Sequence, residues 1–461
     1  MRKTYIIQVI VFILSFTLLS CDKFFDVQPK GKVIPVTTKD YDGMMADPTM
    51  SNNAYPLVDI CSDHVEMQPA AITSMGAIFI GKTYFLMDSF FNETEDDQIW
   101  NNCYSAIYKC NVVIRFTPES KEGTDAEKRR VVAEAKVNRA YYYWFLHSNY
   151  SKAYNKTTAD KDLSVPLLTE PNLEVKAVRA TADKVVASII DDLVSSVDDL
   201  PVVGVNKYRV TKASALALLA RVYLYVNEYE KAAKEALSAL ALNNKLVDFR
   251  TFRFVSDSRP FSGVVNKPNP IDSPEVLFYR DSKSGTVNTS FGLSSDLEAI
   301  YQKYPTDLRY KFHYTGIQMS GVPVPDNIKR FIFKIDYNIG VPEMMLIVAE
   351  NYARKGDIKA LDYLNDLRVF RFLTADYRPL TGSGKDALLN LVLEERQREL
   401  PMTGLRWFDM KRLAEEGLYT KTIVRTFQGV EIKLEPKSNR YLFPLAPKLL
   451  AINPGLIQNP R

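Results

Sequence analysis

The chain has 461 residues, of which 46% are hydrophobic and 25% charged, and its formal net charge is +4. This composition is typical of a globular protein with a large core, and the near-neutral charge argues against a nucleic-acid-binding surface. The length permits either one large domain or two to three smaller ones.

The N-terminus has a basic start and an apolar run over 5–19, and it ends in Ser20-Cys21. The run is shorter than the about 20 apolar residues of a membrane span, and no later segment qualifies as one. These features are typical of a secretory signal, and the Leu-x-Ser-Cys ending resembles the lipobox of bacterial lipoproteins, in which the cysteine thiol is acylated. We therefore expect 1–20 to be a cleaved signal peptide and Cys21 to carry lipid. An ordinary signal peptide with a chance cysteine is the alternative.

Helical periodicity dominates the chain after an extended, proline-containing tether over 21–36. Apolar residues recur three, four or seven apart over 96–116 and 126–150, which predicts two helices. A third helix should begin at Thr181, whose hydroxyl can accept an N–H of the first turn, and should be closed by Pro201.

Two segments, near 211–243 and 342–369, each have the pattern of two antiparallel helices joined by a short turn. Both follow the same order of Leu, Ala, Tyr, turn and Ala, which is similar to a tetratricopeptide hairpin. Because two units do not make a regular solenoid, we expect them to be embedded in a larger helical body.

Two other segments, 40–95 and 247–341, lack this periodicity. In the second, Pro, Gly, Ser and aromatic residues replace the helical pattern, which predicts loops and a few short strands. Irregular segments of this length inside a compact domain tend to be functional surfaces.

Cysteine and histidine spacings give no sign of a metal site, and the chain has no nucleotide-binding loop or nucleophile elbow. We therefore expect no metal, cofactor or catalytic residue. Cys103 and Cys110 lie seven apart on a predicted helix, which puts their Cα atoms about 10.5 Å apart, too far for a disulfide. Buried thiols are the expected state, with a bridge from Cys61 to one of the others left open.

A cluster of alternating charge near the C-terminus contains Glu394, Glu395, Arg396, Arg398 and Glu399. A paired-carboxylate hydrolase needs two carboxyls that face one cleft, about 5 to 9.5 Å apart. Because arginines are interleaved with the glutamates, ion pairs that fix helix packing explain the cluster better than a catalytic pair does.

Several landmarks occur in the order of one known family. They are "SCDKFFDVQPKG", "WNNCYSAIYKCNVVI", "AEAKVNRAYYYWFL", "VPLLTEP", "ALLARVYLY", "LNDLR", "ERQRELPMTGLRWFDMKR" and "LFPLAPKLLAINPGLIQNP". Together they resemble the SusD/RagB family, surface lipoproteins that bind nutrients beside TonB-dependent outer-membrane transporters. Pro401 and Arg461 depart from the family pattern, but neither position would carry ligand chemistry.

This resemblance implies a mostly α-helical fold, with tetratricopeptide-like hairpins in one large domain over 37–461 and a loop-rich ligand face. It implies a non-enzymatic protein that binds a glycan, as oligosaccharide or polysaccharide, and delivers it to a SusC-like TonB-dependent transporter. A lipid anchor would hold the protein on the cell outer membrane, facing the exterior. Peptide binding, as in RagB-type members, is the alternative; a surface glycoside hydrolase using Glu395 and Glu399 has less support.

Sugar binding needs flat aromatic faces and planar polar groups. The family places its ligand site on loops from the two irregular segments, on the face away from the helical hairpins. Our candidate ligand contacts lie in or beside these segments, and they are Asp63, His64, Tyr84, Trp100, Tyr301, Tyr304, Arg309 and Tyr314. The simpler interpretation is that half of them cover the core.

Overall fold

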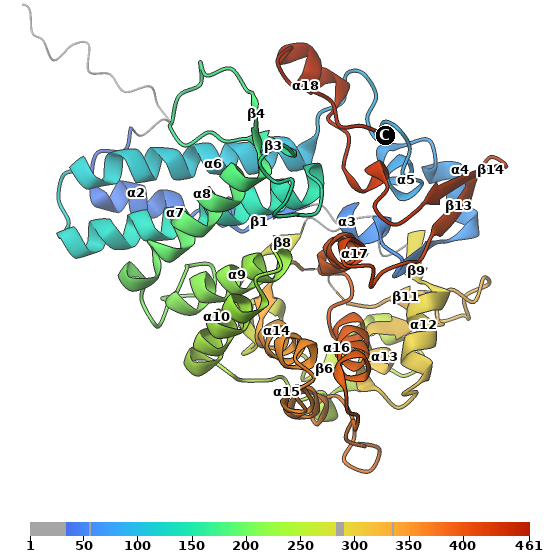
Figure 1. Cartoon of the computed structure of the whole chain (residues 1–461). Coiled ribbons are helices and arrows are strands. Elements are labelled where there is room, and N and C mark those ends of the chain that lie inside the picture. Colours follow the sequence, from blue (N-terminus) through green and yellow to red (C-terminus); the bar gives the residue numbers. More distant parts are fainter. Residues whose placement is uncertain (1–33, 55–56, 283–289, 334–335) are drawn as a thin grey trace, which may run out of the picture.

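The computed structural model describes residues 34–54, 57–282, 290–333 and 336–461. The predicted signal peptide, Cys21 and most of the tether lie outside these ranges. Helices make up most of the regular structure, and the strands are short, so the predicted mostly α-helical fold class is confirmed (Figure 1). Within the described ranges, we find no helix with both the length and the apolar character that a membrane span requires.

Two long antiparallel helices form the N-terminal layer, α6 (Gln98–Phe116) and α7 (Asp125–Tyr150), close to their predicted bounds. A capping box begins α7: Thr124 Oγ1 accepts from the Glu127 N–H, and the Glu127 carboxylate accepts from the Thr124 N–H. Helix α8 (Ala182–Val194) packs on α7 and has Thr181 as its N-terminal flanking residue. The predicted cap bond is wrong, because the Thr181 hydroxyl donates instead to the Asp183 carboxylate.

The two predicted hairpins contain α9 (Lys212–Tyr225) with α10 (Tyr229–Leu242), and α14 (Val341–Arg354) with α15 (Lys359–Arg368). Helix α10 contacts both α9 and α14, so the hairpins lie side by side although about 100 residues separate them. Alanines such as Ala232 and Ala236 line the buried face of α10, and their small side chains let neighbouring helices approach closely.

Two C-terminal helices lie at the centre of the molecule, α16 (Lys385–Glu399) and α17 (Leu405–Glu415). Helix α16 packs on α14 and α15, while α17 contacts α3 (Leu57–Cys61) and α9. Gly404 begins α17 with a φ of 77°, and a Cβ there would come within 2.5 Å of the Tyr337 ring. Glycine is therefore needed to start this helix against its neighbours.

Short elements fill the rest of the described chain. The strands are β1 (Asn52–Ala54), β2 (Val65–Met67), β3 (Leu163–Pro166), β4 (Arg179–Thr181), β5 (Arg253–Phe254), β6 (Val264–Val265), β7 (Val276–Phe278), β8 (Asp281–Ser282), β9 (Phe291–Leu293), β10 (Tyr314–Thr315), β11 (Arg330–Phe331), β12 (Ile339–Gly340), β13 (Ile423–Phe427) and β14 (Val430–Leu434). The short helices are α2 (Thr38–Met45), α4 (Pro69–Met75), α5 (Phe79–Tyr84), α12 (Ser295–Gln302), α13 (Leu308–His313) and α18 (Pro447–Ile452). Single 3-10 turns are η2 (Pro48–Met50), η3 (Thr117–Glu119), η4 (Val197–Asp199), η5 (Phe249–Thr251), η6 (Pro260–Ser262), η7 (Pro270–Asp272) and η8 (Asn439–Tyr441).

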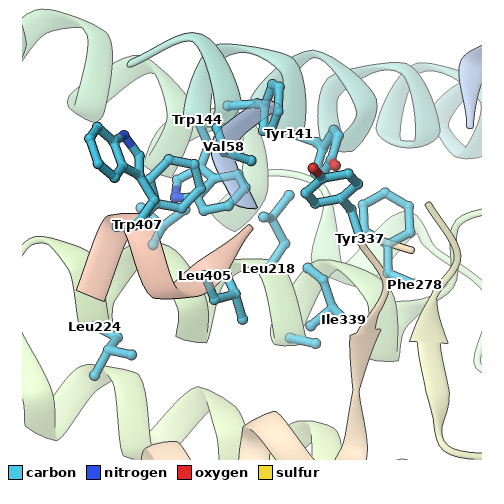
Figure 2. Close-up of a cluster of buried hydrophobic side chains, with 14 of the residues drawn as sticks. Val58, Tyr141, Trp144, Leu218, Leu224, Phe278, Tyr337, Ile339, Leu405 and Trp407 are labelled. Atoms are coloured by element: carbon cyan, nitrogen blue, oxygen red, sulfur yellow. The ribbon is translucent and has the colours of Figure 1, made fainter. Parts of the chain in front are cut away.

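One large hydrophobic core connects the helices with much of both irregular segments. Figure 2 shows its centre, where Trp144 from α7, Leu218 from α9 and Trp407 from α17 come together with residues from β7 and β12. Trp407 is completely buried, and full burial of a large side chain stabilises a fold by roughly 1.5–3 kcal/mol. A second, smaller cluster lies within the segment 247–341 and consists of Val247, Phe249, Phe252, Leu308 and Phe312.

Candidate ligand-binding face

Strand pairing brings the two irregular segments together. The strands β9, β11 and β10 come from 247–341, and β2 from 40–95 pairs antiparallel with β9, placing Glu66 opposite Gly292. A second, parallel pairing joins β1 to β8. A Cβ at position 292 would lie 2.3 Å from the Lys329 carbonyl oxygen, so only glycine lets β9 fit beside β11. We call the parts of the two segments around the pairing of β2 with β9, 57–95 and 290–333, the loop-rich face (blue and yellow on the right of Figure 1).

Asp63 connects the first segment to α17. Its carboxylate accepts hydrogen bonds from Arg406 Nε and Nη2, each at 2.7 Å. Burial alone would raise the pKa of Asp63, but the charge and hydrogen bonds of Arg406 hold it well below its usual range. The Asp63 carbonyl also accepts from the Ser294 hydroxyl at 2.6 Å, at the start of α12. Asp63 thus binds one segment to the other and both to the C-terminal helices.

His64 makes a parallel connection to α16. Its Nε2 lies 3.2 Å from Gln397 Oε1, and its carbonyl accepts from the Ser294 N–H at 3.1 Å. Burial lowers the pKa of His64 to about 4, so the ring is neutral at neutral pH. The imidazole therefore acts as a buried polar contact between elements.

Tyr301 and Arg309 attach the second segment to α16. Both side chains are completely buried. The Tyr301 hydroxyl donates to the Arg398 carbonyl at 2.7 Å. The Arg309 guanidinium pairs with Asp307, and its Nη1 lies 2.7 Å from Glu395 Oε1 and 2.6 Å from Glu399 Oε2. These contacts hold α12 and α13 against α16.

Tyr304 and Tyr314 pack on either side of this connection. Tyr304 is half-buried, and its ring lies between the guanidinium groups of Arg368 and Arg398, at 4.4 Å and 4.7 Å from their central carbons. Tyr314 is buried against Tyr301, with ring centroids 5.5 Å apart. Both rings serve to cover charged and aromatic neighbours.

Tyr84 and Trp100 lie apart from that group. Tyr84 is buried beside β2, where its hydroxyl accepts from the Met67 N–H at 3.2 Å and Arg425 lies 3.9 Å from its ring centre. Trp100 is buried in the helical layer, with its ring 5.1 Å from that of Tyr150. The structure therefore does not bring Trp100 to the other candidates.

Seven of the eight candidate side chains are buried, and Tyr304 is half-buried. The polar contacts of Asp63, His64, Tyr301 and Arg309 join the loop-rich face to α16 and α17. The interpretation that these side chains cover the core therefore applies to seven of the eight candidates, which is more than the half that we expected. Direct ligand contact by these residues stays a prediction, while their anchoring contacts are present in the structure.

A more accessible group on the same face centres on Tyr310, which was not among the candidates. Its ring stacks on Tyr301 with centroids 5.2 Å apart, and its hydroxyl donates to Glu298 at 2.6 Å and accepts from Gln302 Nε2 at 2.9 Å. Gln302 is exposed, and the Glu298 and Lys329 side chains are half-buried. We call Tyr310, Glu298, Gln302 and Lys329 the Tyr310 cluster. It combines the aromatic and planar polar groups that sugar binding uses.

The cluster of alternating charge over 394–399, which lies in α16, forms buried ion pairs, as predicted. Glu395 Oε2 accepts from Arg368 at 2.8 Å and from Arg398 at 2.7 Å. Burial alone would raise the pKa of Glu395, but the charges of Arg309, Arg398 and Arg368 hold it well below its usual range. A carboxyl that stays ionised cannot donate a proton to a leaving group. Its contacts therefore fix helix packing.

The described cysteines Cys61, Cys103 and Cys110 are free and buried, so the open bridge from Cys61 is absent among them. Burial raises the pKa of the Cys61 and Cys110 thiols to about 12, which keeps both protonated. In the part of the chain that the structure describes, no group of three or more His, Cys, Asp or Glu residues is placed to hold a metal ion.

Comparison with known proteins yields one family. A family model described as starch-binding, associating with outer membrane, matches residues 23–224, and the SusD family model matches residues 308–461. The SusD-like protein P38 of Formosa agariphila is 25% identical to the chain, and the match covers 78% of this chain and 78% of P38. The SusD-like protein P2 of the same organism is 27% identical, and the match covers 78% of this chain and 79% of P2.

Solved structures share the fold. A SusD superfamily protein from Bacteroides thetaiotaomicron has a TM-score of 0.73 and 20% identity, covering 92% of this chain and 100% of that one. A laminarin-binding SusD-like protein has a TM-score of 0.63 and 18% identity, covering 92% and 98%. The two family models lie in order along the chain and together match most of it. The chain therefore belongs to the SusD/RagB family.

Proposed function

We propose that this chain is a surface lipoprotein that binds a nutrient glycan, oligosaccharide or polysaccharide, and delivers it to a SusC-like TonB-dependent outer-membrane transporter. Membership of the SusD/RagB family supports the proposal, as does the similar fold of a laminarin-binding protein. The observation that carries it is the pairing of two distant irregular segments into one loop-rich face.

The Tyr310 cluster is the part of this face whose chemistry suits a sugar best. An aromatic ring can cover the C–H side of a pyranose, and neighbouring amide and carboxylate groups can bind its hydroxyls in pairs. Tyr301 supports the Tyr310 ring from behind, so the ring loses little freedom when a ligand binds. Affinity would come from stacking and hydrogen bonds without any bond being broken.

Cys21 would supply the membrane attachment. One acyl chain holds a protein to a bilayer only marginally, whereas two or more hold it firmly. The lipidated chain would then remain on the cell outer membrane, facing the exterior, where it can pass its ligand to the transporter.

Affinity gel electrophoresis of the purified chain against a panel of polysaccharides that includes laminarin tests the proposal. We expect retardation by at least one polysaccharide. Tyr310→Ala should weaken that binding about tenfold or more, equivalent to about 1.4 kcal/mol, whereas Tyr310→Phe should weaken it less. Tyr363→Ala, which removes a half-buried tyrosine from the helical hairpin, is the matched control and should bind normally.

Two results would contradict the proposal. Absence of binding to every glycan, together with peptides that co-purify with the chain, would indicate a peptide-binding function of the RagB type. Glycan cleavage by the purified chain that Glu395→Gln abolishes would indicate a hydrolase.

A further inference from the structure

Lys411 is a buried lysine in the middle of α17, with 7% of its surface exposed. Its Nζ donates to the Ser148 carbonyl at 2.7 Å and to the Ser151 carbonyl at 2.6 Å. These carbonyls belong to the C-terminal end of α7, where carbonyl groups lack partners within the helix. The amine therefore covers the end of a long helix from inside the protein.

The charge on this amine is not balanced by a carboxylate. Among the described residues, Nζ forms no ion pair, and the two carbonyls are its hydrogen-bond acceptors. An ammonium has three N–H donors, so the charged form has one donor more than these carbonyls use. Burying an ammonium without an opposite charge costs several kcal/mol. A nearby anion would therefore stabilise the charged form.

Two cavities adjoin Lys411 and share Lys152, Ala153 and Lys411 in their walls. Their volumes are about 30 Å³ and about 50 Å³. A water-sized group occupies roughly 10–15 Å³ by the same measure, so the larger cavity takes roughly three to five heavy atoms. Formate has three heavy atoms and acetate has four, which makes a small carboxylate the best match in size.

Cations outnumber carboxylates among the side chains that line the two cavities. Lys152, Lys411, Arg412 and Lys437 stand against one carboxylate, that of Glu415. Three of the four cations have acidic partners: Lys152 pairs with Asp162, Lys437 with Glu415, and Arg412 with Asp409 and Glu350. Lys411 is the cation in this set whose charge remains to be balanced.

We propose that Lys411 and the two adjoining cavities form a binding site for a small monovalent carboxylate of formate or acetate size. The carboxylate would accept the third N–H of the Lys411 ammonium and supply the opposite charge. This site is separate from the loop-rich face, so the proposal does not depend on the nature of the glycan.

The histidine and the tyrosines at this place keep one state between pH 6 and pH 9. Burial and, to a smaller extent, the nearby Lys411 charge lower the pKa of His147 to about 3, so the imidazole is neutral. Burial raises the pKa of Tyr154, Tyr225 and Tyr441, so these phenols are neutral as well. Burial lowers the pKa of Lys411 to about 7. A pH change across this range therefore acts mainly through Lys411.

The test is the unfolding midpoint of the full chain as a function of sodium formate, with sodium gluconate, whose anion is much larger than formate, holding the ionic strength constant. At pH 6 we expect formate to raise the midpoint and to saturate, as a ligand of the folded state does. At pH 9 the apparent Kd should be about 10- to 100-fold weaker, because the amine has lost its charge. Lys411→Met should abolish the formate response at pH 6.

Lys448→Met is the matched control, because Lys448 is an accessible lysine that pairs with Asp96. It should respond to formate as the unmodified chain does. Should Lys411→Met fail to fold, the titrations of the unmodified chain at the two pH values still decide the matter. Equal responses at pH 6 and pH 9, or none at pH 6, would overturn the proposal, as would a normal response in Lys411→Met.

Discussion

The packing within each helical hairpin and the packing of the loop-rich face depend on different kinds of contact. In the hairpins, helices that follow one another along the chain pack through apolar side chains such as Leu364. On the loop-rich face, polar side chains reach residues far away in sequence; the Asp63–Arg406 pair spans 343 positions. A local periodic pattern therefore specifies the hairpins, whereas the face depends on pairs of groups that meet only in the folded chain.

The sharpest way to break the loop-rich face is Arg309→Ala. This change leaves Asp307, Glu395 and Glu399 buried without their shared cation, and losing one partner of a buried ion pair costs roughly 3–5 kcal/mol. We expect the free energy of unfolding in urea to fall by that amount and glycan affinity to fall with it. Arg115→Ala, which removes an exposed pair with Glu119, should change stability by less than about 0.5 kcal/mol. A loss below about 1 kcal/mol for Arg309→Ala would contradict the anchoring role.

The corresponding change in the hairpins is Leu364→Ala on α15. Leu364 is completely buried, and truncating such a leucine costs roughly 2–5 kcal/mol through lost burial and the cavity left behind. Urea unfolding measures this loss. We expect glycan affinity at a temperature where the variant remains folded to stay unchanged, since Leu364 belongs to the hairpin helix α15 and not to the Tyr310 cluster. An affinity loss as large as that of Arg309→Ala would remove the distinction between the two regions.

Asp59 gives the loop-rich face a pH-dependent stability. Its carboxyl accepts from the Gly404 N–H at 2.7 Å and hydrogen-bonds the Tyr337 hydroxyl at 2.8 Å, and burial raises its pKa to about 7. Between about pH 4 and pH 7 the folded state keeps a proton that the unfolded chain has released, so stability falls as pH rises. We expect a decline of roughly 2–4 kcal/mol from this group.

Asp59→Asn tests this directly, because an amide imitates the protonated acid and does not titrate. Urea unfolding at intervals from pH 4 to pH 7 should give a flatter profile for Asp59→Asn than for the unmodified chain. Parallel profiles for the two proteins would show that Asp59 is not the source of the slope.

The smallest expected effect belongs to a purely local contact, the capping box of α7. Thr124→Ala removes the side-chain acceptor for the Glu127 N–H and should cost about 1 kcal/mol of stability. Thr124→Ser, which retains the hydroxyl, should be close to neutral. Thermal unfolding distinguishes the two, and a loss equal to that of Leu364→Ala would mean that this cap is coupled to more than its own helix.

Most of the helical framework could be predicted from the sequence. The bounds of α6 and α7 follow from apolar residues at helical spacing, and the hairpins from alanines opposite larger side chains. The cap bond predicted at Thr181 is wrong, because a hydroxyl can either accept from a backbone N–H or donate to a neighbouring carboxylate. Here the Thr181 hydroxyl donates to the carboxylate of Asp183, two residues later.

The candidate site could be predicted only by region. In the stretch 301–314, Tyr301, Tyr304, Tyr310 and Tyr314 are the same residue type at irregular spacing. Tyr301 and Tyr314 are buried, while Tyr304 and Tyr310 are half-buried. The burial of Tyr301 depends on the position of α16, because the Arg398 carbonyl of that helix accepts a hydrogen bond from the Tyr301 hydroxyl.

The sequence by itself determined the helical character of this protein, the family landmarks and the two irregular segments, because periodicity and motif order act over neighbouring residues. The tertiary structure alone decided that these segments pair through β2 and β9, and that Asp63, His64 and Arg309 face inward. The physical reason is that a polar or aromatic side chain can be buried wherever a distant partner satisfies it. Here those partners are Arg406, Gln397 and the glutamates of α16, which no local pattern connects to the loops.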